Sequence, residues 1–579
     1  MKNQYLGRRK FIFNSLLATG GIVLSTNFIS CSDDDDISGE VEIPDDLNQS
    51  NFEQGVASFD PSSSQVIIWT RYNTEADMAS IVWQLSLDQD FTNVLRSGEV
   101  AIDASSDYTL AVEVQNLDAD QKLFYRFINV ADAAVSDVGE TITLPINASQ
   151  VKMAVCSCSN YPAGLFNVYQ VMANSDADII VHLGDYIYEY GAGSYGTNEA
   201  TAGLARQPEP ATEVIQLDEY RTRYKQYRSD ADLKLAHQKK PFICVWDDHE
   251  IANDAYKNGA ENHQASEGDF EVRKMAAIQA YSEYLPVKTT DISLIYRTIN
   301  IGNLVNLIML DTRIIGRDKQ LDYADFYDNL GVFDAVAFQT AWLDSERTIL
   351  GATQRDWLIN EITGNNLPWQ VLGQQVLMGK MLIPAELLGT LSVIVAEVSA
   401  TGSASAATFA LFQQQLQDLT TLKVRMVQGD PTLTAVETAR VTTVLPYNLD
   451  AWDGYPAERE ILYQAFAGKK VVALAGDTHN AWYNNLTDAA GNEVAKEFAT
   501  SSVTSPGLEG YLGTDVDTVA GFQQAFQLLI DDLNYLNASQ RGYVEVTFTQ
   551  AEATSSWIYV DTITSPSFSA TTENTVSYT

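Results

Sequence analysis

The chain has 579 residues and carries 36 lysines and arginines against 76 aspartates and glutamates, a formal net charge of −40. This length predicts two or three domains. The 45% hydrophobic and 19% charged residues exclude a largely disordered or fibrous protein. A surface this acidic repels phosphate backbones, so we expect no nucleic-acid-binding surface. The 5 histidines and 4 cysteines are too few for a histidine-rich zinc site or a disulfide scaffold.

Residues 1–31 have the features of an export signal. Arg8 and Arg9 precede an apolar run over residues 13–24, which is too short to remain as a membrane-spanning helix. The arginine pair resembles a twin-arginine signal. Ser30-Cys31 resembles a lipoprotein cleavage site, which would make Cys31 the lipidated residue. The alternative is an ordinary secretory signal with an incidental cysteine.

The acidic, polar residues 32–50 predict a flexible tether after the signal. We therefore expect an exported protein that is lipid-anchored in the cell envelope, at the outer membrane, in the periplasm or on the cell surface. Its contact with the membrane would be the anchor alone. We also expect it to be a monomer.

Residues 51–146 consist of short alternating segments rich in β-branched and aromatic residues, at 64–70, 81–85, 108–114 and 123–127. Turn residues separate these segments, so the pattern predicts an N-terminal antiparallel β-sandwich. We expect Trp69 and Trp83 to anchor its core.

Residues 147–579 alternate between apolar strands and helices, which predicts an α/β catalytic domain. Five apolar strands end directly before polar residues, namely Cys158, Asp185, Asp248, Gln374 and Asp477. Ligands collect beyond the carboxyl ends of buried strands, so these ends predict one site. An Ala- and Gln-rich stretch with helical Leu spacing predicts a helical insertion near 383–444. The polar residues after Asp561 predict a frayed tail.

The side chains at these strand ends could ligate metal ions. Cys158 and Asn160 are separated by one residue, so both can point the same way from an extended chain, and Asp477 and His479 repeat the gap. Thiolate, phenolate, carboxylate and imidazole together suit a trivalent cation, and an oxygen-rich neighbour suits calcium. The alternative for Cys158 is a small buried hydrophobe. We expect His182 to be a packed core residue and His237 to lie in an exposed stretch.

An ordered set of motifs over residues 52 to 563 resembles the alkaline phosphatase D (PhoD-like) family of the calcineurin-like metallophosphoesterases. The motifs are Cys-Ser-Asn-Tyr at 158–161, His-Leu-Gly-Asp-Tyr-Ile-Tyr-Glu-Tyr at 182–190, Trp-Asp-Asp-His-Glu at 246–250, Leu-Asp-Thr-Arg at 310–313, Gly-Asp-Thr-His at 476–479 and Thr-Ser-Pro-Gly at 504–507. The resemblance implies a four-layer α/β/β/α sandwich after the N-terminal β-sandwich.

The resemblance also implies a dinuclear metal site in which Asp185 bridges two cations. The other implied ligands are Cys158, Asn160, Tyr188, Asp248, Asp477 and His479. The implied ions are one Fe³⁺ with one or two Ca²⁺, and zinc or manganese is less favoured.

The implied activity is metal-dependent hydrolysis of small-molecule phosphate monoesters outside the cytoplasm, with diesters left open, by in-line attack of a metal-bridging hydroxide. His249 would protonate the leaving alkoxide. Arg313 would contact a phosphate oxygen, unless it pairs with acids instead. The alternatives are a dedicated phosphodiesterase of the phospholipase D type and an inactive surface-binding protein on the same scaffold.

Overall fold

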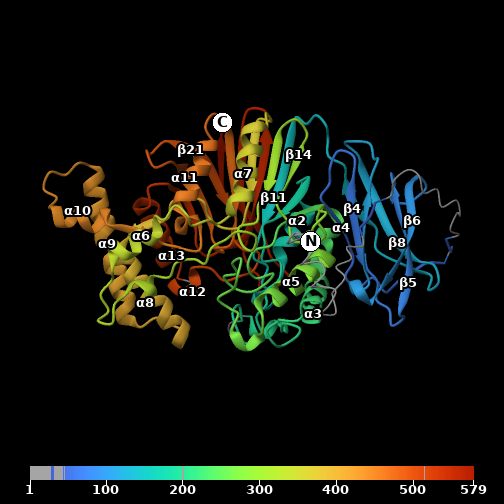
Figure 1. The fold of residues 1–579 in the computed structure, drawn as a ribbon, viewed down its shortest axis with the longest axis horizontal. Coiled ribbons are helices and arrows are strands. Elements are labelled where there is room, and N and C mark those ends of the chain that lie inside the picture. Colours follow the sequence, from blue (N-terminus) through green and yellow to red (C-terminus); the bar gives the residue numbers. More distant parts are fainter. Residues whose placement is uncertain (1–27, 31–42, 45, 198–200, 514) are drawn as a thin grey trace, which may run out of the picture.

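The computed structural model describes residues 28–30, 43–44, 46–197, 201–513 and 515–579 (Figure 1). The predicted signal over 1–27, Cys31 and most of the tether lie outside the described residues. Among the helices of the described ranges, none combines the length and the apolar composition that crossing a membrane requires.

Two large sheets form the centre of the described chain. The first has ten strands, in the spatial order β1 (Phe28–Ser30), β7 (Thr109–Val114), β4 (Val66–Arg71), β3 (Val56–Phe59), β13 (Phe242–Cys244), β12 (Ile179–His182), β11 (Gln150–Cys156), β23 (Arg541–Thr549), β24 (Ala553–Val560) and β25 (Ala570–Tyr578). The second has seven strands, in the order β14 (Arg297–Ile301), β15 (Val305–Met309), β16 (Trp369–Gly373), β19 (Lys470–Ala475), β21 (Glu493–Ala499), β20 (Ala481–Thr487) and β22 (Leu533–Asn537).

The two sheets pack face to face and helices cover their outer faces. Along β19 the buried residues alternate between two cores: Val472 and Leu474 face the first sheet, whereas Val471 and Ala473 face the outer helices. The helices on the first sheet are α2 (Asn167–Asn174), α3 (Leu217–Arg228), α4 (Ala231–Lys239) and α5 (Phe270–Tyr284). Those in the other outer core are α7 (Gly351–Gly364), α11 (Pro456–Ala465) and α13 (Val516–Leu529). This arrangement is the predicted α/β/β/α sandwich.

The N-terminal β-sandwich shares a sheet with the catalytic layers. Its outer sheet contains β2 (Asn48–Gln49), β9 (Ala134–Val135), β8 (Lys122–Asn129), β5 (Met78–Ser86) and β6 (Val94–Asp103), with β10 (Gly139–Ile142) paired to β8. Trp83 and Phe127 from this sheet share one buried core with Val66 and Ile68 of β4. The inner layer β3–β4–β7 continues into the ten-stranded sheet, because β3 pairs in parallel with β13.

Three helices occupy the segment where the sequence predicts an insertion: α8 (Ala385–Thr401), α9 (Ala406–Val427) and α10 (Ala435–Thr442). The antiparallel strands β17 (Leu382–Pro384) and β18 (Val444–Pro446) join at the base of this segment. In Figure 1 the three helices lie at the opposite end of the molecule from the N-terminal strands. Two further helices are α6 (Ala335–Trp342) and α12 (Glu509–Leu512).

The prediction of a frayed C-terminal tail is wrong. Residues 570–578 form strand β25, which pairs in antiparallel register with β24 along its length. Most of its side chains are exposed, so this edge strand lacks the apolar alternation that reveals a strand in sequence. Backbone pairing to β24, rather than burial of side chains, holds it in place.

Candidate metal centre

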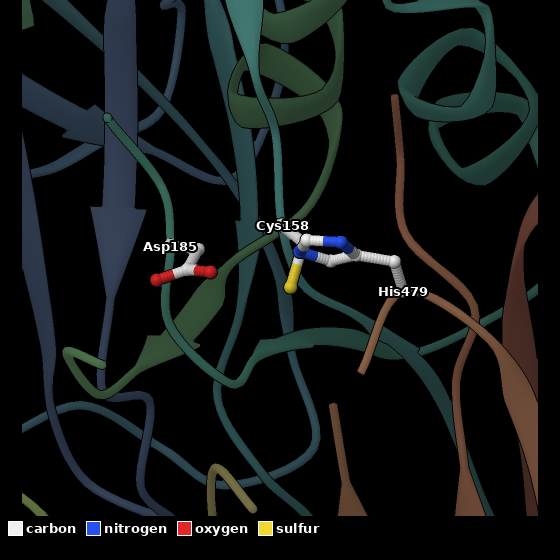
Figure 2. A group of neighbouring side chains, drawn as sticks. All are labelled: Cys158, Asp185 and His479. Carbon is white, nitrogen blue, oxygen red and sulfur yellow. The ribbon is translucent and has the colours of Figure 1, made fainter. Parts of the chain in front are cut away.

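The candidate site lies where β11, β12, β13 and β19 end. The first three are parallel neighbours, so their carboxyl ends meet at one edge of the first sheet. Cys158, Asp185 and Asp248 follow these three strands, and His479 follows β19 of the second sheet. Figure 2 shows Cys158, Asp185 and His479 from three separate segments with their side chains turned toward one another.

The backbone at four of these positions has an uncommon conformation. Cys158, Asp185, Asp477 and His479 have φ of 62°, 55°, 64° and 63°, the left-handed region that non-glycine residues rarely adopt. Each such residue costs of order 1 kcal/mol, and such costs gather at functional sites. This backbone conformation turns the chain sharply after each strand, so that these side chains point into the same region.

Three groups of possible ligands overlap at this place among the described residues. Within each group the ligand atoms lie within 4.8 Å of one another. The groups are Cys158, Asp185 and His479; Asp185, Asp248 and His249; and Asp247, Asp248 and Asp477. Asp185 and Asp248 each belong to two groups, so the groups form a continuous row. The carboxylates of this row could hold metal ions, and Asp185 and Asp248 could each contribute to more than one group.

Tyr188 contacts the row, and Asn160 is the remaining residue of the ligand set that the resemblance implies. The Tyr188 hydroxyl donates to Asp185 Oδ2 at 3.0 Å and lies 3.2 Å from His479 Nε2. Asn160 is buried, and in the described part of the chain neither atom of its side-chain amide has a hydrogen-bond partner. An unpartnered buried amide is uncommon and expensive, which fits an amide whose partner is a bound ion.

The electrostatics of the row also fit cations. Burial raises the pKa of Asp185 and of Asp477 well above the usual range, and the Asp247 carboxylate raises both further. Burial likewise raises the pKa of the Cys158 thiol and the Tyr188 phenol, and the Asp185 carboxylate adds to both shifts. These groups resist ionisation mainly because they are buried, and the opposing effects of His249 on Asp185 and of Arg313 on Asp477 do not reverse the shifts. Metal ions would balance the charge of the ionised groups, and ligands of this kind release protons when they bind metal.

His249 is held by the carboxylate of Glu189, a residue of the motif at 182–190 whose role the sequence does not reveal. Its Nδ1 lies 2.7 Å from Oε2 of Glu189, which is completely buried. Glu189 also accepts bonds from the Asn253 backbone N–H and the Asn262 side-chain amide, each at 2.8 Å. Burial alone would lower the pKa of His249, but the carboxylates of Asp248, Glu189 and Asp185 raise it well above its ordinary value. These three carboxylates therefore favour the protonated form of the His249 ring.

Arg313 is completely buried among acids. Its Nη2 lies 2.9 Å from Asp477, its Nη1 lies 2.8 Å from Asp450, and its Nε pairs with Asp247. This geometry matches the ion-pairing alternative, because its donors already face carboxylates on three sides. That Arg313 binds a phosphate oxygen remains a prediction, and its ion pairs with the three aspartates do not favour it.

Two further residues support the row and were missed from sequence. The buried Glu250 carboxylate accepts the backbone N–H groups of Asp185, Tyr186 and Asp247, at 3.0, 2.5 and 2.7 Å, and so holds the Asp185 turn. The Tyr195 hydroxyl lies 2.9 Å from His479 Nδ1. Glu250 lies in the motif at 246–250, which signals its role, whereas nothing near Tyr195 in the sequence points to His479.

The end of β16 supplies no group to the row. Gln375 donates to the backbone carbonyls of Trp246 and Leu310, and Gln374 accepts from the Trp452 indole. These glutamines tie strand ends together. His182 is buried in the core as expected. The expectation for His237 is wrong, since it is completely buried and stacks on Phe242 with ring centroids 3.8 Å apart. Its polar neighbours in sequence conceal this because helix α4 turns it inward.

Comparison with known proteins agrees with this fold and site. The family "PhoD-like phosphatase" matches residues 153–557, and the family "PhoD-like phosphatase, N-terminal domain" matches residues 39–145. Alkaline phosphatase D of Bacillus subtilis (strain 168) is 30% identical over 562 residues, covering 93% of this chain and 82% of the relative. The solved structure titled "Structure of PhoD" has a TM-score of 0.70 and 28% identity, covering 92% of this chain and 91% of that one.

The fold and the row of ligand groups, together with these matches, define the chain as a phosphoester hydrolase. It belongs to the PhoD-like phosphatase family, and the match to the family's two domains extends over most of the chain.

Proposed function

We propose that the enzyme hydrolyses small-molecule phosphate monoesters, and diesters as a second class, at a dinuclear centre outside the cytoplasm. The observation that carries this proposal is the row of three overlapping ligand groups joined through Asp185 and Asp248. The set of Cys158, Tyr188, Asp185 and His479 is suited to Fe³⁺, and the carboxylates of Asp247, Asp248 and Asp477 are suited to Ca²⁺. When bound, such ions would supply positive charge for the phosphoryl oxygens and lower the pKa of a water.

The chain's own groups supply the rest of the chemistry. His249 faces a cavity of about 330 Å³ that Tyr190, Tyr195 and His479 also line. An ester oxygen in this cavity would take a proton from His249 as its bond to phosphorus breaks. Glu189 accepts from Nδ1, which leaves Nε2 as the ring atom that can transfer a proton. Glu189 is thus a positioning residue for the proton donor.

Elemental analysis combined with two substrates tests this proposal. We expect iron and calcium in the purified enzyme, and a visible colour from a tyrosinate bound to Fe³⁺. We also expect p-nitrophenyl phosphate to be hydrolysed at least as well as bis-p-nitrophenyl phosphate. Two zinc ions without iron would contradict the proposed metals. A preference of about 100-fold for the bis-ester, about 2.7 kcal/mol in barrier, would instead favour a dedicated phosphodiesterase.

Substituting Glu189 should reduce activity in a way that depends on the leaving group. In Glu189→Gln we expect kcat for methyl phosphate to fall about 10–100-fold. The reason is that the carboxylate no longer orients the His249 ring or stabilises its protonated form. The loss for p-nitrophenyl phosphate should be much smaller, since p-nitrophenolate leaves without a proton. The control is Glu267→Gln, which alters a carboxylate 3.5 Å from His263, outside the row. Equal losses with both substrates would contradict the assigned role of Glu189.

We further propose that a lipid on Cys31 holds the enzyme in the cell envelope, on the strength of the signal and cleavage motifs. We also propose that the enzyme is a monomer. Cys31→Ala should move the enzyme from the membrane fraction to the soluble envelope fraction while hydrolysis per molecule stays the same. Fractionation of cells followed by activity measurement checks this. Membrane retention of the Cys31→Ala protein would mean that no lipid on this cysteine holds it.

A further inference from the structure

A second cavity opens directly beside the metal centre, and α8 forms its wall. Its volume is about 440 Å³, within the range of small-molecule sites. Asp477 and His479 of the ligand row stand at one side of this cavity. It shares Tyr447, Leu508, Tyr511, Thr478 and His479 with the cavity that His249 lines. A molecule whose phosphate lies at the ligand row can therefore extend into it.

The wall away from the metal centre is apolar. Leu388, Leu391 and Val395 follow one another at helical spacing on one face of α8 and all line the cavity. Leu508, Tyr447 and Tyr511 also line the cavity.

Among the described lining residues, Asp477 is the only carboxyl group and His479 the only imidazole, and neither lysine nor arginine is present. Ser392, Asn448 and Thr478 also line the cavity and could hydrogen-bond a hydroxyl group. The α8 side of the described lining offers no charged partner to an ionic group, whereas an apolar group would gain from burial against its leucines and valine.

Core packing and an ion pair fix the position of α8, which forms the cavity wall. Leu387 and Ile394, on the adjoining face of α8, are buried in the outer core together with Leu388 and Leu391, so the helix is anchored beside the cavity. Glu386, at the first turn of α8, pairs with Arg440 of α10 at 2.7 Å. An anchored wall favours binding because little conformational freedom is lost when a substrate enters.

We infer that this cavity binds the apolar alcohol portion of the ester, so that the preferred substrates are phosphate esters of lipophilic alcohols. The inference rests on the proposed phosphoesterase function and adds the class of substrate. The insertion segment is then a specificity element, because α8 contributes the apolar wall while the strand ends contribute the reacting groups.

Straight-chain alkyl phosphates test this inference, because their leaving alcohols are nearly alike in acidity and differ in apolar length. We expect kcat/KM to rise roughly two-fold for each partly buried methylene group, and so about 30-fold from methyl phosphate to n-hexyl phosphate. For diester hydrolysis the same comparison uses methyl and n-hexyl p-nitrophenyl phosphate, which share one leaving group.

Two exposed valines on α8 provide a matched pair of variants. Val395 lines the cavity and is 36% exposed, whereas Val393 is 47% exposed and lies outside the lining. Val395→Asp should reduce the hexyl-to-methyl ratio of kcat/KM to about three or less. Val393→Asp should leave this ratio as in the wild type. Ser392→Phe, which would fill the cavity from the same helix, should also lower the ratio.

The possible results distinguish a failure of the proposed apolar substrate class from a failure of the proposed phosphoesterase function. If the wild-type enzyme releases phosphate from p-nitrophenyl phosphate but its hexyl-to-methyl ratio is near one, this inference is overturned and the proposed function stands. A high ratio that Val395→Asp and Ser392→Phe both leave intact also overturns it. If no ester is hydrolysed by the metal-loaded wild type, the proposed function itself is overturned.

Discussion

Replacing Asp185 by Asn should reduce phosphate release by about 10³-fold or more. The Asp185 carboxylate belongs to two of the three ligand groups, and the variant keeps its size while removing the charge. The cations of a phosphoesterase supply several kcal/mol of transition-state stabilisation, and each 1.36 kcal/mol corresponds to a tenfold change in rate. Loss of the shared ligand should therefore lower both the metal content and kcat.

The measurement is turnover of p-nitrophenyl phosphate together with iron and calcium content. Asp176→Asn serves as a matched control, because Asp176 is an exposed aspartate shortly before β12 that pairs with Lys152 at 2.9 Å. Surface pairs of this kind contribute little, so this variant should keep both metal and activity. Unchanged phosphate release in Asp185→Asn would disprove the proposed site as described.

Replacing Arg313 by Met should strongly destabilise the fold. The Arg313 guanidinium is completely buried and pairs with Asp247, Asp450 and Asp477. Removing one partner of a buried ion pair leaves uncompensated charge, with a typical cost of about 3–5 kcal/mol. We expect a clearly lower unfolding midpoint in thermal or denaturant melts of the metal-loaded enzyme.

The same variant distinguishes the two roles that the sequence left open for Arg313. If Arg313 holds the acids of the row together, stability falls. If it contacts phosphate, the unfolding midpoint stays near that of the wild type and KM for phosphate esters rises instead. Arg425→Met is the control, because Arg425 pairs with Asp430 and Glu437 at the surface and its loss should leave the midpoint nearly unchanged.

Much of the candidate site was readable in the sequence because its groups lie close to strand ends along the chain. Cys158 follows β11 by two residues, Asp185 follows β12 by three, and Asp477 follows β19 by two. Parallel strands must bring such ends to one edge of a sheet. This accounts for the meeting of Cys158 and Asp185, which follow neighbouring strands of the first sheet. Asp477 follows β19 of the second sheet, so its place beside them depends on how the two sheets pack.

The supporting contacts could not be predicted in this way. Arg313 pairs with Asp450 and Asp477, which are 137 and 164 residues away along the chain. Glu189 reaches His249 across 60 residues. The partner of a buried polar group depends on which residues the packed fold brings close to it. A local sequence pattern therefore cannot predict these partners.

The amino-acid sequence by itself determined the alternation of strands and helices, the β-rich N-terminal region and the placement of the possible ligands after buried strands, because these follow from local apolar periodicity. Only the tertiary structure decided that β3 joins β13 in one sheet, that residues 570–578 form an edge strand, and that α8 walls a cavity beside His479. Each of these depends on pairing or packing between segments far apart in the chain, and the energy of such contacts appears only once the whole core has formed.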